Sequence, residues 1–215
     1  MNGVHYTSAA RLPAESVIPS ESAASWRTTR DLLCLRSTTS RPSIAKLRYA
    51  LVMQKPGIAI DIPGFGKRMI RTIISDYTGT LSLHGKLTPG VKPRLLRLQK
   101  LLDVRIVTAD TYGTARKQLK GIAEPHMLRK KRQDVVKRDF AKKFDLRHVA
   151  AFGNGNNDRL LLRAVKKAGG IAIAVDNGEG CAVDSLLAAN IFISGAANAL
   201  DLLLHTNAIK ATLRV

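Results

Sequence analysis

Cysteine, acidic residues and long apolar runs are all scarce in this 215-residue sequence. The two cysteines, Cys34 and Cys181, lie far apart and form no C-x-x-C pair, which argues against a zinc or redox site and against a disulfide scaffold. The longest uncharged apolar runs, such as residues 171–175, are far too short to cross a bilayer. The sequence therefore predicts no transmembrane helix, and we expect a protein of the reducing cytoplasm.

The shortage of acidic residues leaves a large positive charge. The chain has 35 Lys and Arg against 16 Asp and Glu, a net charge of +19 and a sequence pI near 10.5. The excess is densest over residues 116–147, but this stretch has a single aromatic pair, Phe140 and Phe144, and no known nucleic-acid-binding motif. We expect a solvated basic face that attracts anions, with nucleic-acid binding as the less favoured alternative.

The N-terminal quarter of the chain differs in composition from the rest. It is rich in Ser, Thr, Arg and Ala and shows no sustained hydrophobic period, so we predict a disordered or dispensable extension over residues 1–54 and one domain over residues 55–215. This bias is typical of an organellar transit peptide, but three acidic residues and the lack of a basic amphipathic helix weaken that interpretation. Alternatively, Met53 is the true start, because globular patterning begins directly after it.

From residue 57 onward, short β-branched apolar runs alternate with longer amphipathic segments. The apolar runs predict strands at residues 57–62, 69–75, 104–108, 149–152, 171–175 and 191–193. The segments between them predict helices at residues 91–102, 112–121, 133–144, 157–168, 180–188 and 196–204. Continuous apolar strands that alternate with helices are typical of a doubly wound parallel sheet covered on both faces. We therefore predict an α/β fold with three layers, α/β/α.

Polar residues follow several of the predicted strands, where ligands bind in folds of this kind. Asp76 follows one strand directly and opens the turn Asp-Tyr-Thr-Gly-Thr, while a Gly-rich loop at residues 153–158 follows another. Thr108 ends a third strand, and we expect Ala109 and Asp110 to open a helix whose N-terminal amides suit a phosphate. Taken alone, each feature is equally compatible with an ordinary turn or helix cap.

In this order, and each at a strand end, these segments resemble the motifs of the haloacid dehalogenase (HAD) superfamily of phosphohydrolases and phosphotransferases. The first HAD motif is Asp-x-Asp-Gly-Thr, or Asp-Lys-Thr-Gly-Thr in P-type ATPases, and residues 76–80 read Asp-Tyr-Thr-Gly-Thr. Thr108 matches the second motif, and residues 153–158 match the fourth. The stretch Ile-Asp-Ile-Pro-Gly-Phe-Gly at residues 60–66 narrows the resemblance to small soluble P-type ATPase-like HAD hydrolases, which have a Rossmann-like domain.

The third HAD motif is a lysine on the helix that precedes the fourth-motif strand. We assign this motif to Lys137 because of its position in the predicted helix. Three neighbouring lysines compete for the assignment: Lys130, Lys131 and Lys142.

The resemblance implies a site for phosphoryl transfer that depends on Mg²⁺. Asp76 would be the nucleophile and form an aspartyl-phosphate. The Mg²⁺ ligands would be the carboxylates of Asp76 and Asp158 and the backbone carbonyl of Thr78. Thr108 and Lys137 would hold the phosphoryl oxygens. The other residues expected to contact the substrate are Gly79, Ala109, Asn154 and Asn157.

Two residues depart from the usual HAD pattern. Thr78 stands where HAD phosphatases carry a second Asp that protonates the leaving group and then activates water, so we predict slow dephosphorylation. Thr occupies this place in P-type ATPases too, so the departure does not imply an inactive site. Asn154 replaces the first Asp of the fourth motif, and because a neutral amide is a weaker Mg²⁺ ligand, we predict reduced metal affinity.

The short spacing between the motifs leaves no room for a cap domain. HAD proteins without caps have open sites, which accept large substrates such as phosphoproteins or are covered by another subunit. We therefore expect a phosphorylated substrate, which can be a large molecule, and ATP is an alternative. A homo-oligomer is also compatible with the sequence. We do not expect ion pumping, because the sequence has no counterpart of the pump's nucleotide-binding domain and membrane helices. The alternative is a catalytically weak phosphate-binding or regulatory module with the same fold.

Overall fold

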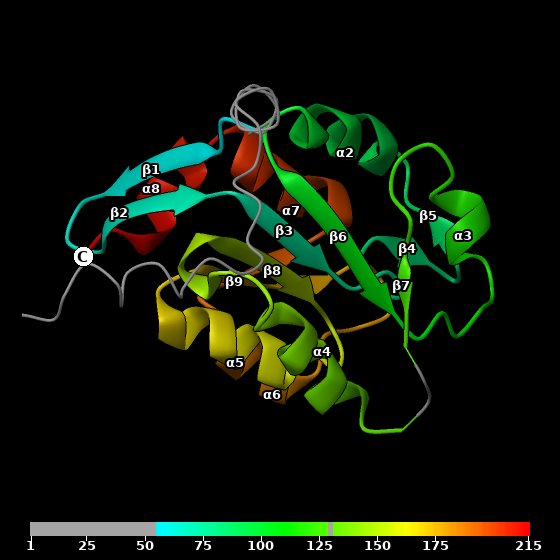
Figure 1. Ribbon diagram of the computed structural model, residues 1–215. Helices are drawn as coiled ribbons and strands as arrows, with labels where there is room; N and C mark the ends of the chain where they lie inside the picture. The colour runs from blue at the N-terminus through cyan, green and yellow to red at the C-terminus, as the bar shows by residue number, and fades with distance from the viewer. Residues whose placement is uncertain (1–54, 129–130) are drawn as a thin grey trace, which may run out of the picture. The chain divides into compact units, whose positions relative to one another are not determined.

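A computed structural model describes residues 55–128 and 131–215 (Figure 1). The expected extension over residues 1–54, with the alternative start at Met53, lies outside the described residues, and so does Lys130. Across the two described ranges, every helix is too short or too polar to span a membrane.

A parallel sheet forms the centre of the domain. Its strands are β3 (Thr72–Ser75), β6 (Asp103–Thr108), β7 (His126–Met127), β8 (Val149–Gly153), β9 (Ile171–Asp176) and β10 (Ile191–Ser194). They lie in the order β10-β9-β8-β3-β6-β7, and each neighbouring pair is parallel. From β3 the chain continues toward one edge of the sheet, and from β8 it continues toward the other. Such a reversal opens a crevice at the carboxyl ends of the two strands.

Helices cover both faces of this sheet. They are α2 (Val91–Gln99), α3 (Ala115–Gln118), α4 (Gln133–Ala141), α5 (Arg159–Ala168), α6 (Val183–Ala188), α7 (Ala196–Leu204) and α8 (Asn207–Leu213). The helices α4, α5 and α6 lie on one face, and α2 and α7 lie on the other (Figure 1). Successive residues of β3 point to opposite faces, so Ile73 and Ile74 belong to different apolar clusters. The predicted α/β/α architecture is confirmed.

Two of the predicted strands differ from the structure. The first is β1 (Ile58–Ile62), which pairs antiparallel with β2 (Gly66–Ile70) in a separate hairpin and is not part of the parallel sheet. Only one face of β1 is covered, because its residues alternate between buried and exposed. The strand predicted at residues 69–75 is in fact two strands, β2 and β3, which are interrupted at the exposed residue Arg71. The Arg71 amide donates to the carbonyl of His148, so the backbone changes partners here.

The segment after Thr108 also differs from the prediction. Ala109 and Asp110 do not open a helix, because Asp110 has a φ of 50° and α3 begins only at Ala115. The Asp110 carboxylate instead accepts hydrogen bonds from the amides of Thr114 and Ala115, at 2.9 and 3.1 Å. Asp110 therefore caps the helix from several residues upstream. The sequence pattern also missed α8, β7 and the small hairpin of β4 (Ser82–Leu83) and β5 (Lys86–Leu87).

Candidate active site

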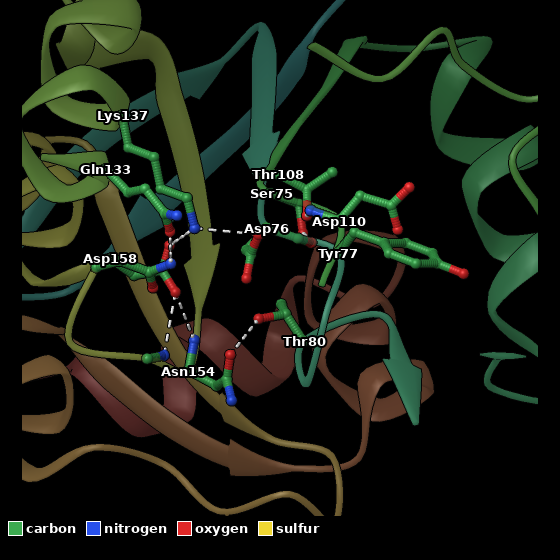
Figure 2. Close-up of polar contacts among 12 residues, drawn as sticks. Ser75, Asp76, Tyr77, Thr80, Thr108, Asp110, Gln133, Lys137, Asn154 and Asp158 are labelled. Carbon is green, nitrogen blue, oxygen red and sulfur yellow. Dashed lines mark hydrogen bonds and ion pairs between the residues drawn. The ribbon is translucent and has the colours of Figure 1, made fainter. Parts of the chain in front are cut away.

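Three charged side chains meet at the carboxyl edge of the sheet, and all three are buried (Figure 2). Asp76 follows β3 directly, Lys137 lies in the middle of α4, and Asp158 stands immediately before α5. The Lys137 ammonium lies 3.0 Å from Oδ1 of Asp76 and 2.7 Å from Oδ1 of Asp158. The fold thus uses one lysine to bridge two carboxylates that are far apart in the sequence.

Burial and charge oppose each other in this cluster. Burial raises the pKa of the Asp76 carboxyl to about 6; the Lys137 ammonium acts against this rise, and the charge of Asp158 adds to it. Burial by itself would lower the pKa of Lys137, but Asp158 and Asp76 outweigh it and raise that pKa above the usual value for lysine. Lys137 is therefore a permanent positive charge near neutral pH, fixed in place by its two partners.

The Asp158 carboxylate is held by the Gly-rich loop. Its Oδ1 accepts from Lys137, and its Oδ2 accepts from the backbone amides of Asn154 and Gly155, at 3.1 Å each. There is no space for a side chain at Gly153, because a Cβ atom there would lie 2.4 Å from the Cβ of Asp158. The glycines therefore let the loop close around the carboxylate, which in turn positions Lys137.

The Asp-Tyr-Thr-Gly-Thr turn packs against the same loop. Gly79 has a φ of 73°, and a Cβ atom there would lie 2.4 Å from Nδ2 of Asn154. The Thr80 hydroxyl donates to Oδ1 of Asn154 at 3.1 Å, while Nδ2 of Asn154 donates to the carbonyl of Gly180 at 3.1 Å. These contacts fix the orientation of the Asn154 amide. The Thr78 hydroxyl is buried and has no hydrogen-bond partner among the described residues.

Thr108 lies at the end of β6, beside the strand that carries Asp76 (Figure 2). Its side chain is buried, and its hydroxyl oxygen accepts a hydrogen bond from the amide of Asp110 at 3.0 Å. The next residue, Ala109, is half-buried. The Asp110 amide therefore fixes the position of the Thr108 hydroxyl oxygen, and the hydroxyl proton remains available to donate a hydrogen bond.

Two further expectations concern Asn157, a predicted substrate contact, and the lysines that compete with Lys137 for the third motif. Nδ2 of Asn157 donates to Oε1 of Gln133 at 2.9 Å, so Asn157 contacts α4. Of the competing lysines, Lys131 is exposed, and Lys142 forms a surface ion pair with Asp139 at 3.4 Å. Among the lysines that the structure describes on this segment, Lys137 is the one that reaches the two carboxylates.

Two polar residues of this region were not singled out by the sequence analysis. Thr80 is the last residue of the first motif, and that position is the signal that could have identified it. Gln133 lies one helical turn before Lys137, and residues at i and i+4 share a helix face, so it could have been sought as a neighbour of the motif lysine.

The oxygen atoms that could bind a metal ion are of the type that Mg²⁺ prefers, but only one of the three belongs to a charged carboxylate. Mg²⁺ prefers hard oxygen ligands, and the carboxylate of Asp76, the carbonyl of Thr78 and Oδ1 of Asn154 are of that type. Within residues 55–128 and 131–215, however, no group of three His, Cys, Asp or Glu side chains is placed to hold a metal ion. An ion held by these oxygens would therefore keep coordination positions open for other ligands.

Comparison with solved structures identifies the class of fold. The cobalt-bound deoxy-D-mannose-octulosonate 8-phosphate phosphatase of Haemophilus influenzae is 16% identical, with a TM-score of 0.51 over 68% of this chain and 94% of that one. The 3-deoxy-D-manno-octulosonate 8-phosphate phosphatase of Moraxella catarrhalis, solved with magnesium and phosphate ions, is 19% identical, with a TM-score of 0.49 over 67% and 94% of the chains. The chain shares its fold with the H. influenzae phosphatase, which confirms the predicted Rossmann-like α/β architecture.

Sequence comparison gives a nearer relative. The chain is 42% identical over 66 residues to the uncharacterized protein MJ0073 of Methanocaldococcus jannaschii, a match that covers 31% of this chain and 67% of that protein. The chain belongs to the same family as MJ0073. No known protein-family model matches the sequence.

Proposed function

We propose that this protein is a HAD-type phosphohydrolase whose nucleophile is Asp76. The observation that carries the proposal is the buried Lys137 ammonium, 3.0 Å from Asp76 and 2.7 Å from Asp158, at the carboxyl edge of the sheet. Two carboxylates and one ammonium leave the cluster with a net negative charge, which favours a divalent cation beside it. A phosphoryl group would then bind between this cation and the Lys137 ammonium.

In the first step, Asp76 attacks the phosphorus atom of the substrate. Oδ1 of Asp76 is engaged by Lys137, so we assign the attack to Oδ2. The Oδ2–P bond forms while the bond from phosphorus to the leaving oxygen breaks, and the leaving oxygen takes a proton from solvent. Thr108 donates its hydroxyl proton to a phosphoryl oxygen, and Lys137 offsets the negative charge of the transferred group.

In the second step, water hydrolyses the aspartyl-phosphate. The water oxygen forms a bond to phosphorus while the Oδ2–P bond breaks, and the proton that the water loses goes to solvent. Inorganic phosphate is released and the Asp76 carboxylate is restored. Thr78 can donate a hydrogen bond to the phosphoryl group but cannot accept the proton of the attacking water near neutral pH. We therefore propose slow turnover and a persistent phosphoenzyme, as in the P-type ATPase-like branch that the motifs resemble.

We propose Mg²⁺ as the cofactor, with Asp76, the Thr78 carbonyl and Asp158 as ligands. Asp158 is the ligand least available for direct contact, because Oδ1 accepts from Lys137 and Oδ2 from two backbone amides. Oδ1 of Asn154, which accepts one hydrogen bond from Thr80, is the alternative. The ion would neutralise charge on the transferred phosphoryl group. The cobalt in the H. influenzae phosphatase is compatible with a divalent ion in the same fold.

The substrate that we propose is a phosphate ester or anhydride. The described residues include no cap domain over the cluster, which supports a site open to large substrates. ATP as a substrate, the P-type ATPase-like mechanism, a homo-oligomer and a cytoplasmic location remain predictions from the sequence.

The test measures Mg²⁺-dependent phosphate release by the full-length chain from p-nitrophenyl phosphate, ATP and phosphopeptides. We expect slow turnover by the unmodified protein and none by Asp76→Asn, while Asp61→Asn, at an exposed position on β1, keeps full activity. A label on Asp76 that is stable in acid and released by hydroxylamine would support the aspartyl-phosphate.

The second candidate is a phosphate-binding or regulatory module that keeps the fold and loses turnover. Thr78, which provides no acid or base, is the observation that favours it. If the unmodified protein and Asp76→Asn are folded and equally inert, and both bind inorganic phosphate, the phosphohydrolase assignment is wrong and the module is the better account.

A further inference from the structure

A cavity of about 660 Å³, broadly open to solvent, lies between the start of α4 and the start of α5, beside the charged cluster. Its lining residues are Arg132, Gln133, Asp134, Asn156, Asn157 and Arg159. Two of them adjoin residues of the cluster along the chain: Gln133 lies one helical turn before Lys137, and Asn157 directly precedes Asp158. Their side chains are joined by a hydrogen bond of 2.9 Å, and Figure 2 shows Gln133 alongside Lys137 and Asp158.

The two arginines of this cavity are weakly paired. Arg159 contacts Asp134 at 3.4 Å and Asp184 at 3.5 Å. Strong charge-assisted hydrogen bonds are about 2.7–2.9 Å long, as is the pair of Arg94 with Asp201 at 2.7 and 2.8 Å. Arg132 has no ion-pair partner within the described part of the chain. Two guanidinium groups thus stand beside two carboxylates, Asp134 and Asp184, but the contacts of Arg159 are long and Arg132 forms no ion pair with any described residue, so both arginines keep donors for an incoming anion.

The backbone of Arg132 is in an unfavourable conformation. Its φ of 52° and ψ of 43° lie in the left-handed region, where glycine is tolerated far better than a residue with a Cβ atom. Arg132 is the N-cap residue of α4, but its side chain makes no capping hydrogen bond. A capping bond from its side chain therefore does not account for the left-handed backbone of Arg132, and residues in such strained conformations cluster at ligand-binding sites.

We propose that this cavity binds a second anionic group of the substrate, a phosphate or a carboxylate, while the first phosphoryl group reaches Asp76. The proposal rests on the phosphohydrolase function proposed above. Arg132 and Arg159 bind the second group through their planar guanidinium donors, which match carboxylate and phosphate oxygens. Asn156 and Asn157 add amide donors at the same wall. The substrate class is a phosphorylated compound that carries a second acidic group.

The test uses α,ω-alkane bisphosphonates of increasing spacer length, which cannot be hydrolysed, and alkyl monophosphonates of matched length. Binding to the full-length protein in Mg²⁺ is measured by calorimetry. We expect at least one spacer length to bind about tenfold or more tightly than its monophosphonate, because bidentate guanidinium contacts are strong. Phosphonocarboxylates of the same lengths show whether the second group is a phosphate or a carboxylate.

Three variants locate the effect. Arg132→Gly and Arg159→Gln are expected to abolish the gain, whereas Arg163→Gln, an exposed position one turn further along α5, is expected to keep it. Arg132→Gly also removes the backbone strain, so its melting temperature should equal or exceed that of the unmodified protein. A loss of affinity without a loss of stability separates ligand binding from a structural role. The proposal is overturned if no spacer length improves binding, or if Arg163→Gln lowers the gain as much as the cavity variants do.

The cavity proposal and the proposed function fail in different ways. If p-nitrophenyl phosphate is hydrolysed through Asp76 but bisphosphonates gain nothing, the cavity proposal is wrong and the function stands. If bisphosphonates bind with a gain that depends on Arg132 and Arg159 but no substrate is turned over, the two-anion site stands as that of a binding module. If both hold, Arg132→Gly should lower kcat/KM for bisphosphates and leave that for p-nitrophenyl phosphate unchanged.

Discussion

Nζ of Lys137 lies 2.7 Å from Oδ1 of Asp158, and neither side chain is exposed to solvent. A buried ion pair is costly to break from one side, because the charge that remains stays out of water without a partner. The Lys137 ammonium, which would bind a phosphoryl group, therefore also holds α4 against the start of α5 through its contact with Asp158.

Replacing Lys137 by methionine should destabilise the protein by about 3–5 kcal/mol, the cost typical of removing one member of a buried pair. The carboxylates of Asp76 and Asp158 would then face each other without a cation. Urea unfolding measures the loss, and Lys142→Met, at an exposed position, serves as the control. The double variant Lys137→Met/Asp158→Asn should recover part of the lost stability. A single variant as stable as the unmodified protein would contradict this account of the cluster.

Asp76→Asn should stabilise the metal-free protein above about pH 6. The pKa of Asp76 is about 6 in the folded protein and 3.8 in its ordinary state, so the folded form binds the proton more tightly. The contribution of Asp76 to stability therefore falls as the pH rises from about 4 to about 6 and stays low above that range. Because asparagine does not titrate, the advantage of the variant should shrink toward pH 4. Urea unfolding in EDTA at several pH values checks this, and a constant difference between the proteins would count against it.

Gly79→Ala should cost more stability than Gly113→Ala. Both glycines have a positive φ, 73° and 68°, but a Cβ atom at Gly79 would lie 2.4 Å from Nδ2 of Asn154, whereas nothing lies within 4 Å of one at Gly113. The two substitutions thus carry the same cost in backbone strain, about 1 kcal/mol each. Any additional loss of stability in Gly79→Ala therefore measures the clash with Asn154. Thermal melting of the two variants gives the comparison. Equal losses would show that the Asp-Tyr-Thr-Gly-Thr turn does not pack closely against Asn154.

Thr78→Asp should accelerate release of phosphate from the phosphoenzyme, because the new carboxylate can take the proton of the attacking water. General bases typically contribute about 10²–10⁴-fold, and we expect at least the lower end of that range. Rapid-quench measurement of the decay of the labelled enzyme tests the prediction, with Thr78→Val as a control of similar shape. An unchanged decay rate in Thr78→Asp would show that the missing acid/base group does not limit turnover.

The sequence predicted the positions of the candidate site residues that stand at strand ends. Asp76 and Thr108 each follow an apolar run, and parallel strands bring their carboxyl ends to one edge, so local pattern was enough to place both residues. Lys137 was chosen over its neighbours because of its spacing from the fourth motif. In the structure burial distinguishes it, because Lys137 faces α5 while Lys131 and Lys142 face solvent.

Other features depend on contacts that local sequence does not encode. The run Ile-Ala-Ile-Asp-Ile of β1 is compatible with a buried strand, and only its pairing with β2 shows that Ala59 and Asp61 are exposed. Arg71 divides β2 from β3 because its amide pairs with a residue of the segment before β8. Arg132 and Arg159 line one cavity although they belong to different helices, and neither residue is part of a motif.

The position of β3 between β6 and β8 has a consequence for biosynthesis. Both partners of β3 follow it in the chain, starting at Asp103 and Val149, so the strand that carries Asp76 leaves the ribosome long before it can be flanked on both sides. Pairing between distant parallel strands is slow, and its unpaired intermediates tend to aggregate. We expect chains shortened to residue 148, which lack β8, to be sensitive to protease although they contain Asp76 and Lys137. The interval between synthesis of β3 and of β8 is then the stage at which a nascent chain has most need of a chaperone.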